Sequence, residues 1–160
     1  MDFMHDSLCD VRSFRTLKIL DTYTRQCLHI EAGTSLNRER VVRVLERLIA
    51  QRGKPQVIRI DNGPEFRGQK LDVCAYKNQV KLEFIQPGKP TQNAHIESFN
   101  SKLRDECLQM EWFTSLSEAR TVIEEWRIDY NTQRPHSSLN HLPPDIWAQK
   151  QNEKLLHQVG

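Results

Sequence analysis

Three acidic residues at widely separated positions are the side chains of this 160-residue chain best suited to chemistry. Asp61 follows the β-branched segment 56–60 and opens an Asp-Asn-Gly-Pro turn. Open α/β sheets form their binding crevices at strand ends of this kind. Glu97 lies in a helical segment reached after one further strand, and Asp2 lies in the first strand. If the first and fourth strands are neighbours, the three carboxylates converge.

Clusters of carboxylate oxygens without histidine or cysteine favour hard cations such as Mg²⁺ or Mn²⁺ over zinc. Two such ions about 3.5–4 Å apart can activate an attacking oxygen and stabilise a leaving oxygen in phosphoryl transfer. Without metal the carboxylates repel one another, so at least one pKa should be raised. For any single acid, capping of a turn is the alternative interpretation. Asn62 and Gly63 are expected to shape the turn that directs Asp61.

The helix predicted for residues 92–104 has two distinct stripes. Polar side chains recur at helical spacing on one stripe, at Asn93, Glu97, Ser101 and Arg104. Apolar side chains recur on the other, at Ile96, Phe99, Leu103 and Cys107. We expect the apolar stripe to face the core, which leaves a carboxylate and a guanidinium beside the buried edge. A surface helix with a solvated polar side is the alternative.

Five segments have the alternation and composition of β-strands. They cover residues 1–8, 14–20, 25–32, 56–60 and 81–85. The first three are joined by short turns, which predicts an antiparallel meander, and the last two are predicted to be parallel. The order of elements predicts an α/β fold with a mixed five-stranded sheet flanked by helices.

Helices are predicted over residues 37–52, 66–78 and 92–104, and from Ser115 to a point before Pro135. Asn37 is the expected N-cap of the first, and Ser115 and Glu118 have the spacing of a capping box. The expected domain covers residues 1–147, followed by a polar tail or short helix over 148–160. Packing roles are predicted for the three tryptophans, Trp112, Trp126 and Trp147.

The composition is that of one ordinary globular domain, with 38% hydrophobic and 28% charged residues. No apolar run is long enough to span a bilayer, and no signal-peptide pattern is present, so we expect no membrane partner. Four scattered cysteines predict reduced, mostly buried thiols in a cytoplasmic protein and no zinc site. The net charge of +2 is a weak nucleic-acid signal, although local clusters of Lys and Arg allow a basic face.

The segments around the three acids resemble the DDE motif of retroviral integrases and of OrfB-type insertion-sequence transposases. They read Met-Asp-Phe at 1–3, Ile-Asp-Asn-Gly-Pro-Glu-Phe at 60–66 and His-Ile-Glu-Ser-Phe-Asn at 95–100. The 35 residues 62–96 separate Asp61 from Glu97, a spacing typical of that superfamily, and Arg104 is the basic residue seven positions after the glutamate. The similarity extends to segments 19–25, 87–90, 104–108 and 130–139, and to Trp126.

This resemblance implies an RNase H-like fold and metal-dependent cleavage and transfer of DNA strands. Asp2, Asp61 and Glu97 would be the catalytic residues and would hold two Mg²⁺ (or Mn²⁺) ions, with Asp2 bridging both. Water would attack a phosphodiester at the element end, and the freed 3′-OH would attack a second phosphodiester. Asp6 and Asp21 are alternative first ligands, although the motif favours Asp2 and a turn cap is the better interpretation of Asp21.

The same resemblance implies DNA-backbone contacts beside the metals. Arg104 would make the main contact, because a guanidinium gives charge-assisted phosphate bonds that set register and affinity. Further contacts would come from Asn93, Ser101 and Lys102. His95 is interpreted as exposed and His136 as structural, with DNA contact as the alternative for both.

The implied partners are DNA, as transposon ends and target, and further copies of the chain in a dimer or higher multimer. The implied location is the bacterial cytoplasm, at the nucleoid during the reaction. Relatives carry an N-terminal DNA-binding region before the first aspartate, so the chain is expected to be a core fragment with impaired activity. Two alternatives stay open: an RNase H-like nuclease that only hydrolyses, and a non-catalytic DNA-binding or dimerisation remnant.

Overall fold

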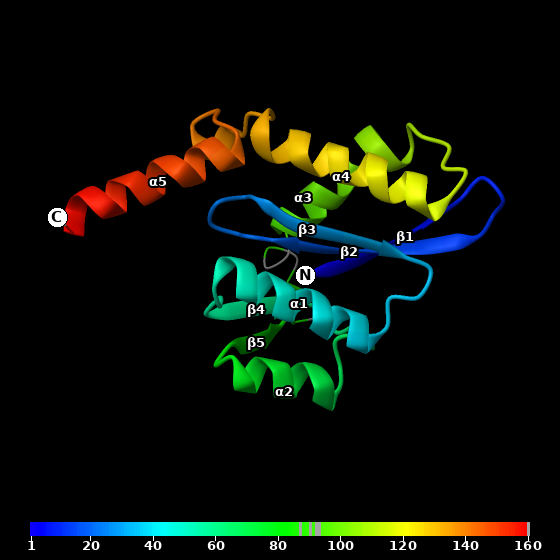
Figure 1. Cartoon of the computed structure of the whole chain (residues 1–160), viewed down its shortest axis with the longest axis horizontal. Helices are drawn as coiled ribbons and strands as arrows, with labels where there is room; N and C mark the ends of the chain where they lie inside the picture. The colour runs from blue at the N-terminus through cyan, green and yellow to red at the C-terminus, as the bar shows by residue number, and fades with distance from the viewer. Residues whose placement is uncertain (87, 90, 92–93, 160) are drawn as a thin grey trace.

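The computed structural model describes residues 1–86, 88, 89, 91 and 94–159 (Figure 1). Its strands are β1 (Asp2–Ser7), β2 (Ser13–Leu20), β3 (Cys27–Gly33), β4 (Val57–Ile60) and β5 (Lys81–Phe84). Its helices are α1 (Arg38–Arg52), α2 (Gln69–Lys77), α3 (Ala94–Leu103), α4 (Leu116–Thr132) and α5 (Pro144–Val159). A π-helical turn (Arg104–Leu108) continues α3, and a 3₁₀ turn (Ser137–Leu139) precedes α5.

The strand pairing confirms the predicted α/β architecture. β1, β2 and β3 form an antiparallel sheet in that order, and β4 pairs with β5 in parallel. The two ladders meet where the Met1 nitrogen donates a hydrogen bond to the Arg59 carbonyl oxygen at 2.7 Å. This contact sets the start of β1 beside β4, so residues early in the chain adjoin the end of the fourth strand.

The three-stranded sheet separates two hydrophobic cores (Figure 1). Helices α3 and α4 cover one face, where Phe14 of β2 packs with Phe99 and Ile123. Helix α1 covers the other face, where Leu17 of β2 packs with Val44. Side chains of a strand alternate between faces, which explains how successive parts of β2 serve both cores. It also directs Lys18, an even-numbered residue like Phe14, towards α3.

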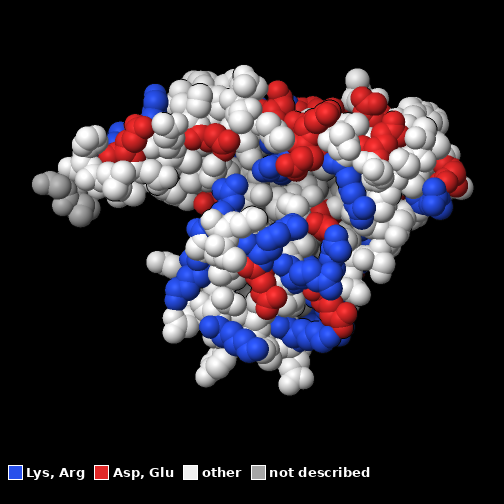
Figure 2. Space-filling model, viewed as in Figure 1, with Lys and Arg blue, Asp and Glu red and all other residues white. Residues whose placement is uncertain are grey.

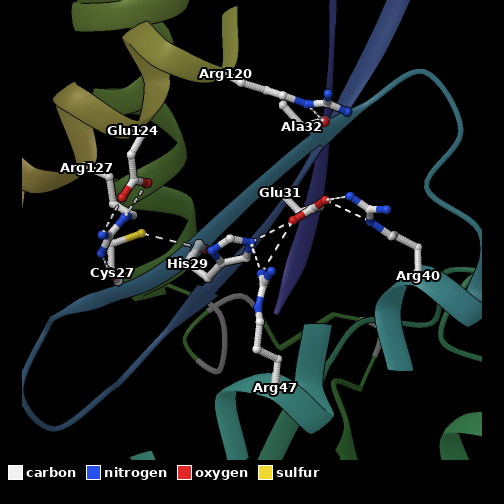
Figure 3. Close-up of polar contacts among 9 residues, drawn as sticks. All are labelled: Cys27, His29, Glu31, Ala32, Arg40, Arg47, Arg120, Glu124 and Arg127. Carbon is white, nitrogen blue, oxygen red and sulfur yellow. Dashed lines mark hydrogen bonds and ion pairs between the residues drawn. The ribbon is translucent and has the colours of Figure 1, made fainter. Parts of the chain in front are cut away.

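The outer strand β3 is covered at both ends by side chains of α4 (Figure 3). Arg120 donates to the Ala32 carbonyl oxygen, and Arg127 donates to the Cys27 carbonyl oxygen, each at 2.8 Å. Asn131 accepts a hydrogen bond from the Cys27 backbone N–H at 2.8 Å and donates to its carbonyl oxygen at 2.9 Å. These bonds satisfy backbone groups that an edge strand otherwise exposes.

The predicted helix caps are present, one of them in altered form. Asn37 accepts a hydrogen bond from the Arg40 backbone N–H at 3.0 Å, as expected. Ser115 accepts from the Glu118 backbone N–H at 3.1 Å. The Glu118 carboxylate, however, accepts from the backbone and hydroxyl of Thr114, both at 2.6 Å, so the returning half of the box is made one residue earlier.

Other sequence expectations differ from the structure. Trp112 is 84% exposed, so its predicted packing role is wrong, whereas Trp126 and Trp147 pack as predicted against Phe99 and Tyr23. Trp112 lies in the irregular segment before α4, so it does not belong to a helical face that packs against the core.

Two helix boundaries also differ. The second helix begins at Gln69 and not at Phe66, because the Phe66 ring is fully buried against Phe3 within the preceding turn. The last helix begins at Pro144, ahead of the expected boundary at residue 147. Within the described ranges, no helix combines the length and apolar character needed to cross a bilayer.

Candidate active site

Asp2 and Asp61 are neighbours at the place where β1 and β4 adjoin. The pKa of Asp61 is raised above its usual value, mainly because the carboxyl group is partly buried. The nearby Asp2 carboxylate raises the pKa further through repulsion, while the Gly63 backbone N–H opposes the shift. The structure therefore unites two of the three predicted acids, which lie 59 positions apart in the numbering.

The turn after β4 directs Asp61 into this site. Gly63 donates its backbone N–H to Asp61 Oδ1 at 2.8 Å. A Cβ atom on Gly63 would lie only 2.9 Å from the same oxygen, so a side chain at this position would displace the carboxylate. Asn62 donates to the Ile85 carbonyl oxygen at 2.9 Å, which ties the turn to the end of β5. Both residues shape the turn as the sequence indicates.

Two residues that sequence reasoning did not assign to the site hold Asp2. Asn100 of α3 donates a hydrogen bond to Asp2 Oδ2 at 2.6 Å. Lys18 lies opposite Asp2 in the β1–β2 register, and its Nζ is 3.8 Å from the same oxygen. The alternation of side chains along β2 could have identified Lys18 as a residue of this site. Helical spacing could have identified Asn100, which lies three positions after Glu97.

Lys18 has an unusual environment for a lysine. Its side chain is fully buried, and its Nζ has no hydrogen-bond partner within the described part of the chain. Burial lowers the Lys18 pKa to about 8, while attraction to Asp2 opposes the change and the Arg104 charge adds to it. A buried positive group therefore lies beside Asp2.

Glu97 is exposed on α3, and the structure does not bring it into contact with the acid pair. Its side chain makes no hydrogen bond or ion pair with other described residues. The same residues contain no group of three His, Cys, Asp or Glu side chains that could hold one metal ion. Helix α3 nevertheless reaches the site, because Asn100 lies one turn beyond Glu97 and contacts Asp2.

The acid pair fits a divalent cation in its donor chemistry. Asp2 Oδ2 is used by Asn100, and Asp61 Oδ1 is used by Gly63. No N–H or O–H donor among the described residues reaches the second oxygen of either carboxylate. Two adjacent carboxylate oxygens without donors are ligands that suit Mg²⁺ or Mn²⁺.

The predicted DNA contacts fall on different sides of α3. Arg104 and Ser101 are exposed, and the Ser101 hydroxyl donates to the Glu97 carbonyl oxygen at 3.3 Å. Lys102 is half-buried and lines a recess together with His136. Asn93 lies outside the described residues, as do two prolines of the predicted loop 87–90.

Comparisons with known proteins give a consistent result. Two models described as "Integrase core domain" match residues 1–90 and 78–144. The chain is 49% identical over 150 residues to the "Insertion element IS407 uncharacterized 31.7 kDa protein" of Burkholderia multivorans. That similarity covers 94% of this chain and 54% of the relative, so the chain spans about half the length of this curated relative.

Solved structures similar to this chain include retroviral proteins. One is a chain of the simian T-cell lymphotropic virus intasome in complex with PP2A regulatory subunit B56 gamma, with a TM-score of 0.74 and 16% identity, covering 89% of this chain and 50% of that one. Another is the HTLV-2 integrase catalytic core domain in complex with magnesium, with a TM-score of 0.61 and 17% identity, covering 89% of both chains. At these identities the likeness shows the fold, which is RNase H-like.

Proposed function

This chain belongs to the integrase core domain family, and we propose that it is the catalytic core of an insertion-sequence transposase. The proposed reaction cleaves a DNA strand at the element end and transfers the resulting 3′-OH to target DNA. The observation that carries the proposal is the adjacency of Asp2 and Asp61, supported by the raised pKa of Asp61. The proposed core is residues 1–147, with the remainder of α5 as an extension.

The proposed cofactor is Mg²⁺ or Mn²⁺, bound by Asp2, Asp61 and Glu97. When bound, two such ions supply charge stabilisation to the attacking and leaving oxygens of the phosphodiester. Asp2 and Asp61 offer one oxygen each that no described donor occupies. Glu97 is proposed as the third ligand on the strength of the motif, and reaching the pair requires a change in the placement of α3 or of its side chain.

The other residues of the site position these acids. Asn100 fixes Asp2 Oδ2, and the buried ammonium of Lys18 offsets the negative charge. Gly63 fixes Asp61 through its backbone N–H. Arg104 and Ser101 are exposed on the Glu97 side of α3, where we propose that they contact the DNA backbone.

The proposed partners are transposon ends, target DNA and further copies of the chain. The similar HTLV-2 integrase core is described in trimeric and dimeric forms, which supports self-association of this fold. The bacterial insertion-element relative supports a cytoplasmic reaction at the nucleoid. Activity of the complete protein is part of the proposal, since the chain covers half of that relative.

The test compares Asp61→Asn with the wild-type chain and with Asp10→Asn, a matched change at an exposed ion pair with Arg12. Mn²⁺ binding is measured by calorimetry, and cleavage and strand transfer are measured on oligonucleotides with an intact or a pre-cut 3′ end. Asp61→Asn should weaken Mn²⁺ binding at least tenfold and abolish both reactions, while Asp10→Asn should change neither.

Two results would contradict the proposal. Unchanged Mn²⁺ binding in Asp61→Asn would remove this residue from the metal site. Cleavage without any transfer from the pre-cut end would favour the nuclease that only hydrolyses.

A further inference from the structure

A recess runs beside α3, from Met1 next to Asp2 at one end to His136 at the other. It has a volume of about 1040 Å³ and is bordered by the β2–β3 turn, α3, residues 135–141 and α5. Figure 2 shows the molecule hollowed beneath α5, with Lys and Arg side chains at the border. We call it the basic recess, because five Lys and Arg residues line it: Arg25, Arg52, Lys54, Arg59 and Lys102.

Negative charge within the basic recess is scarce. Asp21 is the one acidic side chain among its described lining residues. Asp21 Oδ1 is already occupied, because it accepts hydrogen bonds from the backbone N–H groups of Tyr23 at 2.8 Å and Thr24 at 3.1 Å. As the sequence indicates, this acid caps its turn.

The cations of the recess differ in how they are paired. Arg59 donates two hydrogen bonds to Glu83, and Lys54 donates to Gln79. Arg25 and Lys102 form no ion pair with any described carboxylate. Their charge is therefore available to a ligand, and both are half-buried, where a charge is screened less than on an open surface.

Two buried nitrogen atoms in the recess lack partners. Arg25 Nη1 and His136 Nε2 are shielded from solvent and have no hydrogen-bond partner within the described residues. The His136 ring is 9% exposed and packs edge-on against Tyr130, with ring centroids 4.9 Å apart. Its backbone is fixed by a bond from its N–H to the Leu142 carbonyl oxygen at 3.2 Å. Buried polar atoms in native proteins are normally satisfied, so these two point to a missing acceptor or donor.

The charges of Lys102 and Arg25 act on the His136 ring. Burial lowers the pKa of His136 to about 4, and the charges of Lys102, Arg134 and Arg25 contribute in that order. Arg134 is paired with Glu106, which leaves Lys102 and Arg25 as the uncompensated charges near the ring. Three separate segments of the chain thus contribute basic groups to the lining of the recess.

We propose that the basic recess binds a phosphate group of a nucleic acid strand through Arg25, Lys102 and His136. An anion with several acceptor oxygens would satisfy the unpaired guanidinium nitrogen and pair with both charges. The choice of nucleic acid as the source of the phosphate rests on the proposed function. The site itself is separate, because Lys102 follows Glu97 by five positions, about 140° around an α-helix.

The test measures binding of a fluorescein-labelled oligonucleotide by anisotropy in EDTA, where no divalent ion is bound. The double variant Arg25→Gln/Lys102→Gln is compared with Arg43→Gln/Lys77→Gln, which removes the same charge from exposed positions outside the recess. The recess variant should bind at least tenfold more weakly, with a salt slope reduced by roughly 0.7–0.9 for each lost phosphate contact. Equal losses in the two variants would overturn the proposal.

A second measurement identifies the source of the phosphate. The His136 ring resonances should shift on addition of inorganic phosphate and should shift at far lower concentration of oligonucleotide. A response to inorganic phosphate alone would overturn the nucleic acid assignment. Calorimetry separates this proposal from the proposed function: the recess variant should bind Mn²⁺ like the wild type, and Asp61→Asn should keep its oligonucleotide affinity in EDTA.

Discussion

The two sides of α3 have opposite character. On one side Asn100 donates a hydrogen bond to Asp2, whose neighbouring cation Lys18 is also part of the protein interior. On the other side Lys102 and His136 line a recess in which Lys102 and Arg25 form no ion pair with a described carboxylate. Between them Phe99 is 2% exposed and anchors the helix in the core. One helix therefore separates a site suited to a cation from a site suited to an anion, because residues three or four positions apart share a face and others do not.

The largest expected effect comes from removing the anchor that both sides share. Phe99→Ala should lower the free energy of unfolding by about 3–5 kcal/mol, because it deletes a ring packed against Trp126 and Tyr130. Urea denaturation at pH 7 measures the change, and both Mn²⁺ and oligonucleotide binding should weaken together. Trp112→Ala, at an exposed ring, is the control and should change stability by less than about 0.5 kcal/mol. Loss of one binding activity alone would show that the two sides are positioned independently.

A smaller effect should distinguish the basic side by its pH dependence. The folded-state pKa of His136, about 4, is below the unfolded value of 6.5, so its neutral form is favoured by folding. The free energy of unfolding therefore has its full value, as far as His136 is concerned, above pH 6.5. It decreases as the pH falls towards 4, by a total of about 3 kcal/mol. The groups facing this ring are Lys102, Arg134, Arg25 and Tyr130.

The measurement is an NMR titration of the His136 ring together with urea denaturation at pH 7 and pH 4.5. In the folded protein the ring should stay neutral down to about pH 4, while the free energy of unfolding already decreases below pH 6.5. A normal titration near pH 6.5 in the folded state would contradict the buried position of the ring.

The smallest of these effects concerns the acid side. Asn100→Ala removes the donor to Asp2 Oδ2, and hydrogen bonds to charged groups contribute about 1.5–3 kcal/mol. We expect the free energy of unfolding to fall by an amount near the lower limit of this range, because Lys18 still lies 3.8 Å from the same oxygen. Mn²⁺ binding should weaken while oligonucleotide binding in EDTA stays unchanged. A matched Asn78→Ala change at an α2 cap serves as control. A parallel loss of oligonucleotide binding would show that the two sides are coupled.

Local sequence patterns predicted the secondary structure and the buried faces of this molecule well. The spacing of Ile96, Phe99 and Leu103 identified the buried stripe of α3, and alternation identified the meander. Both signals depend on residues close together in sequence, so a single sequence carries them. The turn at Asn62 and Gly63 was predicted for the same reason.

Contacts between distant segments were harder to predict. The bond from Asn100 to Asp2 joins residues 98 positions apart, and the burial of Lys18 depends on α3 covering β2. The basic recess joins a β-turn, a helix and an irregular loop, whose relative placement has no periodic signal. The packing role predicted for Trp112 was wrong for a different reason. The residue lies outside any helix or strand, so periodicity could not show which side of it is buried.

The covering of β3 by α4 limits how copies of this protein can associate. An incoming strand would have to displace Asn131 from both backbone groups of Cys27, and Arg120 from Ala32. Continuous β-sheets across two molecules are therefore disfavoured along this strand, as is fibril growth from it. A multimer that forms along this strand must therefore use contacts between side chains on helical surfaces. Changes in the charge of those side chains can then alter its geometry.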